Sequence, residues 1–464
     1  MPATRTIAEQ RAPELSTKSS AQTLARRLSA ARERTLLHAC ALSGEQLLGP
    51  RLASVNPPLW EIAHVAWFQE HWCLRHRAGE TAAPSIIGNA DAMYNSALAA
   101  HDTRWDLPLL AFDAVRRYLD DILQRVLERL TLDPDDLALR YFCELSAAHE
   151  EMHNEAFTST RQTLGYAGLH PDQAVAARGA PCQGDAAVAG GDFMLGAPCG
   201  GQFVFDNEKW AHRVPLQPFS IARTAVTNDE FCAFVDAGGY GRREFWCADG
   251  WRWRDSAGAA APVYWIKEGG LWLSRVYANV EPLAPHAAVL HVNWYEADAW
   301  CRWAGRRLPT EAEWEQAAGT WPGNAHGVDG KRTYPWGEQS PAAEHANLYG
   351  VRNAVAPVSA FVAGDSAWGC RQMVGNVWEW TADCFSPYPG YARDQYAEYS
   401  EPWFGNHKVL RGGCFATSAA LLRNTWRNFY TPDRRDVFAG FRSCAAAGAG
   451  TAGVAGFAPE HGPA

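Results

Sequence analysis

Apolar residues recur every three or four positions through the first third of the chain. Between residues 111 and 130 they are Val115, Leu119, Ile122, Val126 and Leu130. This spacing places all of them on one face of an α-helix. Similar patterns cover residues 21–40, 57–76 and about 135–165, and two prolines at the start of the second pattern suit a helix start. Four long helices with one apolar face each predict a four-helix bundle over residues 20–165.

The composition changes after Gly165. A stretch rich in alanine and glycine, residues 166–190, is expected to be a linker. Residues 191–446 are rich in glycine and tryptophan, and they predict a second domain of short strands and loops. A chain of 464 residues exceeds one ordinary core, which agrees with this division. The ends, 1–19 and 447–464, lack apolar periodicity and are expected to be disordered.

Charge and cysteine content narrow the class of partner. The net charge is -9, which disfavours nucleic acid and anionic membranes because both attract basic surfaces. No apolar run is long enough to span a membrane, and the first twenty residues have no apolar core of a secretory signal. The 12 cysteines are scattered without a CxxC pair. We expect reduced thiols in a cytoplasmic protein that acts on small molecules.

Two histidines in "LSAAHEEMHNE" have the spacing of metal ligands. His149 and His153 are four residues apart, so they lie on one helix face. A third ligand should come from a facing helix, where His64 lies within the apolar run "EIAHVAWF". Glu155 does not share the ligand face, and we expect it to orient a ligand histidine or a neighbouring loop. Three histidines suit zinc or iron(II) equally.

Four blocks in the second half carry a family resemblance. They are "GRRLPTEAEWEQAA" (305–318), "GNVWEWTAD" (375–383), "VLRGGCFAT" (409–417) and "FAGFR" (438–442). They resemble the signature blocks of the formylglycine-generating-enzyme-like domain, which is related to C-type lectins. The implied fold class is α+β, with a DinB-like four-helix bundle followed by that domain. Formylglycine-generating enzymes themselves carry a catalytic cysteine pair after "RGG", whereas here Cys414 has no second cysteine nearby.

With the bundle and its histidines, the chain is similar to the ergothioneine-type non-haem iron sulfoxide synthases. These enzymes use dioxygen to couple a sulfur donor to C2 of the imidazole of hercynine, which is N-trimethylhistidine. The family's HxxxHxE motif matches "HEEMHNE", and its upstream ligand matches His64. The resemblance therefore implies Fe(II) held by His64, His149 and His153, with hercynine and O2 as substrates.

The resemblance also implies substrate contacts near the C-terminus. Asn428 matches an asparagine that contacts the hercynine imidazole, and Arg434 matches an arginine that binds the donor's carboxylate. Arg435 is adjacent, and it can equally brace loops. Trp426 and Phe429, with Trp380, are expected to form aromatic walls, since aromatic faces suit a quaternary ammonium.

Three positions depart from members that use γ-glutamylcysteine. Tyr430 stands where those members have an acidic residue, and Met152 where they have glutamine. Phe385 stands where they have a catalytic tyrosine, and a phenyl ring cannot donate a proton. Residues 86–110 are expected to form a long loop between the second and third helices of the bundle, and this loop contains Tyr94. Another branch of the family places a tyrosine on that loop, so Tyr94 is the candidate proton donor. The alternative for Tyr94 is a packed loop aromatic.

These departures resemble the selenoneine synthase branch, in which a selenosugar donates selenium to hercynine. A sulfur-using enzyme with a cysteine or γ-glutamylcysteine donor is the alternative. A zinc-dependent thiol transferase is a further alternative, since related bundles use a histidine triad in that way. A non-catalytic binding module is the remaining class, because lectin-like folds often only bind ligands.

Overall fold

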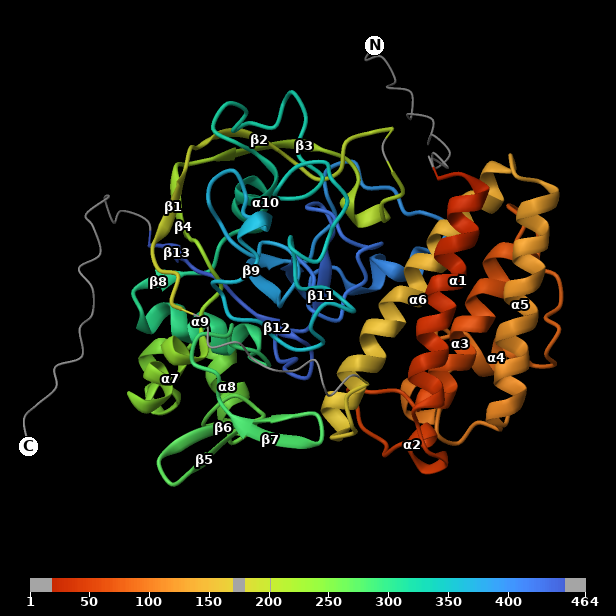
Figure 1. Cartoon of the computed structure of the whole chain (residues 1–464), viewed down its shortest axis with the longest axis horizontal. Helices are drawn as coiled ribbons and strands as arrows, with labels where there is room; N and C mark the ends of the chain where they lie inside the picture. Colours follow the sequence, from red (N-terminus) through yellow and green to blue (C-terminus); the bar gives the residue numbers. More distant parts are fainter. Residues whose placement is uncertain (1–18, 170–179, 201, 447–464) are drawn as a thin grey trace, which may run out of the picture.

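The computed structural model describes residues 19–169, 180–200 and 202–446. A helical part and a mixed part of strands, loops and short helices lie side by side (Figure 1). The α+β fold class is therefore confirmed. The terminal segments expected to be disordered lie, apart from Ser19, outside the described residues.

Four long helices form the bundle, as the apolar spacing predicts. They are α1 (Ala21–Cys40), α3 (Pro58–Glu70), α5 (Phe112–Leu132) and α6 (Leu137–Leu164), with the short α2 (Gly44–Leu48) after the first. The α1 helix is capped by Ser20, whose hydroxyl accepts a hydrogen bond from Thr23 N at 3.2 Å. The α6 helix is capped by Asp136 and ends at Gly165, which has a φ of 68° that favours glycine.

The segment between α3 and α5 is more ordered than a long loop. After Glu70 the chain continues as one π-helical turn, His71–Arg75. The expected loop from residue 86 to 110 contains a short helix, α4 (Ala90–Tyr94), and a 3-10 turn (His101–Thr103). Periodicity could not indicate α4, because a helix of five residues has little more than one turn.

The second domain is built from small sheets. One four-stranded sheet has the order β1 (Asp185–Val188), β4 (Phe219–Ala222), β13 (Cys444–Ala445) and β8 (Arg306–Arg307). The other has the order β11 (Asn428–Tyr430), β10 (Lys408–Arg411), β9 (Trp378–Cys384) and β12 (Ala439–Gly440). The smaller sheets are β2 (Gly191–Leu195) with β3 (His212–Leu216), and β5 (Trp265–Glu268), β6 (Leu271–Val276) and β7 (Asn279–Pro282).

The linker is shorter than the composition predicted. Strand β1 lies within the expected linker, residues 166–190, and pairs with β4 from Asp185↔Ala222 to Val188↔Phe219. Its residues alternate between exposed and buried, and the buried ones, Ala186 and Val188, belong to the domain core. One of the alanines that suggested a linker, Ala186, thus belongs to the core, and β1 is the first strand of the second domain.

Four short helices complete the second domain. They are α7 (Asn228–Asp236), α8 (Ala248–Ser256), α9 (Trp294–Trp303) and α10 (Glu311–Gly319). The segments of α7 and α9 are helical, and both helices begin with a capping box, at Thr227 and at Asn293. Across the described residues all twelve cysteines are free thiols.

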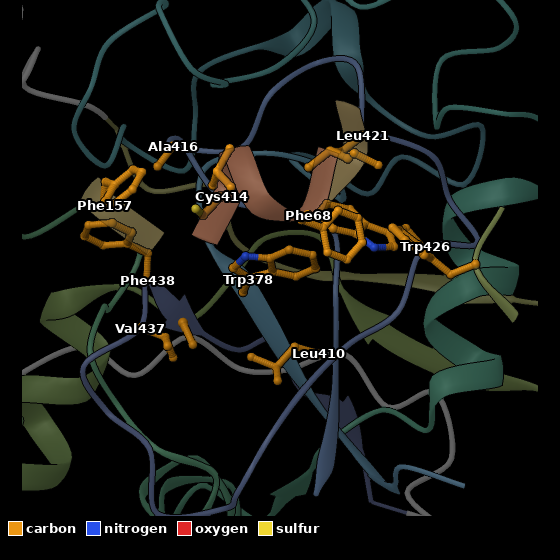
Figure 2. Close-up of a cluster of buried hydrophobic side chains, with 14 of the residues drawn as sticks. Phe68, Phe157, Trp378, Leu410, Cys414, Ala416, Leu421, Trp426, Val437 and Phe438 are labelled. Carbon is orange, nitrogen blue, oxygen red and sulfur yellow. The ribbon is translucent and has the colours of Figure 1, made fainter. Parts of the chain in front are cut away.

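Both parts of the chain contribute to one buried cluster at their boundary (Figure 2). Phe68 from α3 and Phe157 from α6 lie with Trp378 and Trp426 of the second domain, and each of these side chains is buried. Helix α6 lies on the face of the bundle that meets the second domain (Figure 1). Burial of this apolar surface holds the two parts in a fixed relation.

Candidate metal centre

The three predicted ligand histidines come together at the centre of the bundle. His64 is on α3, and His149 and His153 are one turn apart on α6. Their Nε2 atoms lie 3.3 Å apart between His64 and His149, and 3.2 Å apart between His149 and His153. A single ligand atom from each of the three lies within 4.8 Å of the others, the one such cluster of three or more found among the described residues.

Hydrogen bonds at the far side of two rings decide which nitrogens face inward. His64 Nδ1 lies 2.6 Å from the Tyr94 carbonyl oxygen, and His153 Nδ1 lies 2.6 Å from Glu61 Oε1. These oxygens accept hydrogen bonds, so both Nδ1 atoms carry the proton and both Nε2 atoms present lone pairs. Lone pairs that converge on one point repel each other unless a cation lies between them, which fits a metal ion.

The environment also keeps two of these imidazoles, those of His64 and His149, neutral, as metal ligands must be. Burial, with a smaller effect of His153, holds the pKa values of His64 and His149 well below their usual range. The ring of Phe68 stacks on His149, with centroids 3.6 Å apart, and Trp60 stacks on His64 at 5.0 Å. These aromatic contacts fix the ring planes, so the geometry suits a resident divalent metal of the iron or zinc type.

A polar chain extends from His153 toward the opening of the site. Glu61 accepts from His153 through one oxygen, and its other oxygen accepts from Asn56 Nδ2 at 3.2 Å. Asn56 Oδ1 in turn accepts from Arg104 at 2.6 Å. The guanidinium of Arg104 lies 3.8 Å above the ring of Trp60. Asn56 and Arg104, which both line the cavity described next, therefore hold the Glu61 carboxylate in position.

A cavity of about 710 Å³ lies between the bundle and the second domain, and His153 lines it. The bundle contributes Asn56, Ser96, Ala97, His101, Arg104, Met152, His153 and Glu155. The second domain contributes Tyr396, Glu398, Tyr399, Pro402, Trp403, Trp426, Asn428, Phe429 and Tyr430. A cavity of this size accommodates two small substrates beside the histidines.

Glu155 joins the two domains instead of orienting a ligand histidine. Its Oε1 accepts from Trp378 Nε1 at 2.6 Å, and its Oε2 accepts from the Thr417 hydroxyl at 2.5 Å. Burial raises the pKa of Glu155. Of the two expected roles, contact with a neighbouring loop is the one observed, and Glu61 occupies the position beside the ligand histidine.

Five of the expected substrate residues line the cavity: Met152, Trp426, Asn428, Phe429 and Tyr430. The sulfur of Met152 lies 3.5 Å from the Tyr399 hydroxyl. Strand β11 supplies the last three of the five, and its pairing with β10 fixes where their side chains project. The cavity wall next to His153 is thus formed by residues that the sequence indicated.

The expected role of Tyr94 as proton donor is not supported by its position. Its hydroxyl accepts a hydrogen bond from Leu110 N at 3.2 Å, and Tyr94 is not among the described residues that line the cavity. The backbone carbonyl of Tyr94, and not its phenol, faces the metal ligands. The alternative of a packed loop aromatic is therefore the one the geometry favours.

Two arginines and a phenylalanine also lie outside the cavity lining. Arg434 is paired side-on with Asp436 at 2.6 Å through both Nε and Nη2. Arg435 lies 3.8 Å from Glu296 and stacks over Trp253, which agrees with a bracing role.

Phe385 is buried and stacks on Phe429, with centroids 4.0 Å apart. Trp380, expected as a wall, is buried as well and donates to the Val292 carbonyl at 2.9 Å.

Sequence reasoning missed two tyrosines on the irregular loop before β10. The ring of Tyr396 lies 5.0 Å from Phe68 and 6.2 Å from His149, measured between centroids. Tyr399 contacts Met152, as described, and stacks on Phe205 at 4.2 Å. The stretch "DQYAEYSEPWF" has no periodicity that could place it. Glu61 did carry a signal, because it is an acidic residue within an apolar helical run.

Two family models divide the chain where the structure divides it. The DinB superfamily model matches residues 27–156, and the model of the sulfatase-modifying factor enzyme 1-like domain matches residues 172–447. A DinB-like bundle with a three-histidine centre, joined to this domain, defines a class of metal-dependent enzymes with a site between two domains. No helix among the described residues has the length and apolarity needed to cross a membrane.

Curated relatives cover nearly the whole chain. The hercynine oxygenase of Mycolicibacterium thermoresistibile is 36% identical over 90% of this chain and 94% of its own length. The enzyme of the same name from Mycolicibacterium smegmatis is 36% identical, over 91% and 98%. The formylglycine-generating enzyme of Streptomyces coelicolor is 34% identical but covers 58% of this chain. The chain belongs to the hercynine oxygenase family, the ergothioneine-type sulfoxide synthases, and is an oxygenase.

Proposed function

We propose that this protein is an iron(II)- and dioxygen-dependent oxygenase that joins the selenium of a selenosugar to C2 of the hercynine imidazole. The observation that carries the proposal is the three-histidine centre beside a large cavity whose opposite wall is strand β11. A neutral histidine triad leaves coordination positions open, as non-haem iron oxygenases require. Bound iron would supply the redox chemistry with dioxygen, and the protein would position both organic substrates.

Hercynine suits the β11 side of the cavity. Asn428 lines the cavity and offers an amide for the imidazole, while its Oδ1 accepts from Phe429 N at 2.8 Å, which holds its orientation. Trp426, Phe429 and the two loop tyrosines present aromatic faces to the same space. Such faces attract a quaternary ammonium through cation–π contacts. The imidazole would then lie between the aromatic wall and the histidines.

The donor side favours a molecule without an amino-acid head group. Arg434, the expected partner of a carboxylate, already forms a two-bond pair with Asp436. Tyr430 and Met152 line the cavity, at positions where the resemblance implies an acidic residue and a glutamine in members that use γ-glutamylcysteine. A selenosugar has a neutral, hydroxyl-bearing head, which tyrosine hydroxyls and aromatic faces can bind. Because the three histidines are neutral, a bound divalent metal would keep its full positive charge, and that charge would attract a chalcogen anion.

The proposed reaction balances with one dioxygen. The C2–H bond of hercynine and the Se–H bond of the donor break, and a C2–Se bond forms. Dioxygen accepts four electrons: one oxygen atom leaves as water with the two hydrogens, and the other stays on the chalcogen. Because burial raises the pKa values of Tyr396 and Tyr399, both phenols remain protonated at neutral pH. They replace Tyr94 as the proposed proton donors, since both line the cavity.

Two alternatives follow from the same site. With cysteine or γ-glutamylcysteine as donor, the same balance would give a sulfoxide, and Tyr430 and Met152 would only alter affinity. With zinc in the triad the protein would be a thiol transferase that needs no oxygen. The second domain, which supplies half of the cavity lining, argues against zinc thiol transfer because such a reaction has no need of a second organic site.

A turnover assay followed by mass spectrometry tests the proposal. Protein loaded with iron(II) under nitrogen would receive hercynine, air and one donor: a selenosugar, cysteine or γ-glutamylcysteine. A selenium-bearing hercynine adduct from the selenosugar, with oxygen consumed, is the expected result. An adduct from a thiol donor only would assign the protein to sulfoxide synthesis. Transfer of the donor by zinc-loaded protein without oxygen would instead identify the protein as a thiol transferase.

A further inference from the structure

The loop from Tyr391 to Phe404 forms one wall of the cavity but has almost no regular structure. It contains two 3-10 turns, Ala397–Tyr399 and Glu401–Trp403, and no strand. Five of its residues line the cavity: Tyr396, Glu398, Tyr399, Pro402 and Trp403. A loop with few backbone hydrogen bonds needs side-chain contacts to hold one position. Two aspartates supply those contacts.

Asp206 holds the loop from within the second domain. The side chain is buried, and its Oδ2 accepts from the Tyr391 hydroxyl at 2.8 Å and from Asp394 N at 3.3 Å. Its Oδ1 accepts a short hydrogen bond from the Ser400 hydroxyl. These three donors lie on both sides of Tyr396 and Tyr399 in the sequence. The carboxylate thus fixes the two ends of the segment that carries the tyrosines.

Asp394 connects the same loop to the metal-binding helix. Its Oδ2 accepts from the hydroxyl of Tyr141 on α6 at 3.0 Å. Lys209 Nζ donates to both oxygens, at 2.9 and 2.7 Å, and both side chains of this ion pair are about one-tenth exposed. A partly desolvated, charge-assisted contact of this kind is stronger than one on the surface. Tyr141 lies eight residues before His149, two turns along the helix.

We propose that Asp394 is a positioning residue of the oxygenase, which sets Tyr396 and Tyr399 against the metal centre by tying their loop to Tyr141 of α6. The bond crosses from the second domain to the helix that carries His149 and His153. It fixes the distance between the phenols and the histidine cluster, and small errors in such a distance reduce rates strongly. Asp206 and Lys209 hold the aspartate in place. The inference rests on the proposed function only for the role of the tyrosines.

Tyr141→Phe is the most selective test because it removes one hydroxyl and leaves the helix packing. Tyr166→Phe removes a hydroxyl just beyond the end of the same helix and serves as the control. For Tyr141→Phe we expect full metal content, a kcat reduced about 10-fold or more, an unchanged KM for hercynine, and a larger solvent deuterium isotope effect. Asp394→Asn should give the same changes. Turnover would be measured with whichever donor the wild-type protein accepts.

A second measurement does not depend on the donor. Amide hydrogen exchange of residues 391–404, read by mass spectrometry, should be at least about 10-fold faster in Tyr141→Phe than in wild type or Tyr166→Phe. Faster exchange in Tyr141→Phe, combined with no turnover by the wild type or any variant with any donor, would support the loop contact while refuting the proposed function. Exchange and isotope effect equal to wild type in both Tyr141→Phe and Asp394→Asn would overturn the inference.

Discussion

Glu61 Oε1 lies 2.6 Å from Nδ1 of His153, so a buried carboxylate on one helix orients a candidate metal ligand on another. The contact fixes both the proton on Nδ1 and the plane of the ring. Carboxylate partners of this kind raise the basicity of an imidazole ligand. The acidic residue is therefore part of the metal centre although it does not point at the metal position.

Glu61→Gln should weaken metal binding by about 10- to 100-fold, because an amide oxygen is a poorer acceptor and carries no charge. Competition with a coloured chelator would measure the affinity for iron(II) or cobalt(II). Glu128→Gln, on the exposed face of α5, is the matched control. Equal affinity in both variants would show that Glu61 does not contribute.

His64→Ala should abolish stoichiometric metal binding and reduce turnover to below roughly 1% of wild type, because two ligands on α6 cannot hold the ion alone. His71→Ala, one residue beyond the end of the same helix, should retain the metal. Metal content would be read by mass spectrometry after dialysis. Full metal occupancy in His64→Ala would exclude His64 as a ligand.

Glu155→Ala should lower the free energy of unfolding by about 2–4 kcal/mol, because it leaves the buried Trp378 indole and the Thr417 hydroxyl without their acceptor. Glu155→Gln keeps an oxygen at the same place and should cost less. Chemical denaturation of metal-free protein measures both. The critical result is which variant loses more stability. If only the charge of Glu155 mattered, both variants would lower the free energy of unfolding by the same amount.

His291 should make the fold sensitive to acid. Burial lowers its pKa to about 4, whereas in the unfolded chain it is about 6.5. The folded state therefore binds fewer protons, and stability is complete above pH 6.5 and is lost as pH falls toward 4, by up to about 3 kcal/mol. His291→Asn keeps a residue that tolerates the φ of 61° at this site. Its melting temperature should fall less steeply between pH 6.5 and 4.5 than that of wild type.

Met152→Gln with Tyr430→Asp should move donor preference toward γ-glutamylcysteine, by about 10-fold in the ratio of kcat/KM values, since one added hydrogen bond contributes about 1 kcal/mol and about 1.4 kcal/mol corresponds to a factor of ten. Each single variant should give a smaller change. Competition between a selenosugar and γ-glutamylcysteine in one reaction measures the ratio directly. An unchanged ratio in the double variant would separate these two positions from donor choice.

The long helices and the histidine cluster could be predicted because both follow from regular spacing. Periodic apolar residues fix the faces of α5 and α6, and a histidine within an apolar run makes His64 the candidate for the third ligand. The partners of those residues could not be read in this way. Glu155 points away from the ligand face, and only the tertiary structure shows that Trp378 and Thr417 donate hydrogen bonds to it.

The substrate-domain loops were less accessible to sequence reasoning. Arg434 is paired with Asp436, two residues away, a local contact that competes with any ligand. Tyr396 and Tyr399 lie on a segment whose position depends on Asp206 and on α6, both far away in the sequence. No periodic pattern encodes such contacts, because they arise only when the two domains have packed together.

Helix α6 makes contacts on two sides: His149 and His153 point into the bundle, and Glu155 points into the second domain. These three residues lie within two turns of one rigid rod, so they cannot shift independently. Metal occupancy and association of the two halves are therefore linked equilibria. An ion that binds the docked arrangement more tightly than the separated halves would stabilise the association by the difference between its two binding free energies, and separation of the halves would weaken its binding by the same amount.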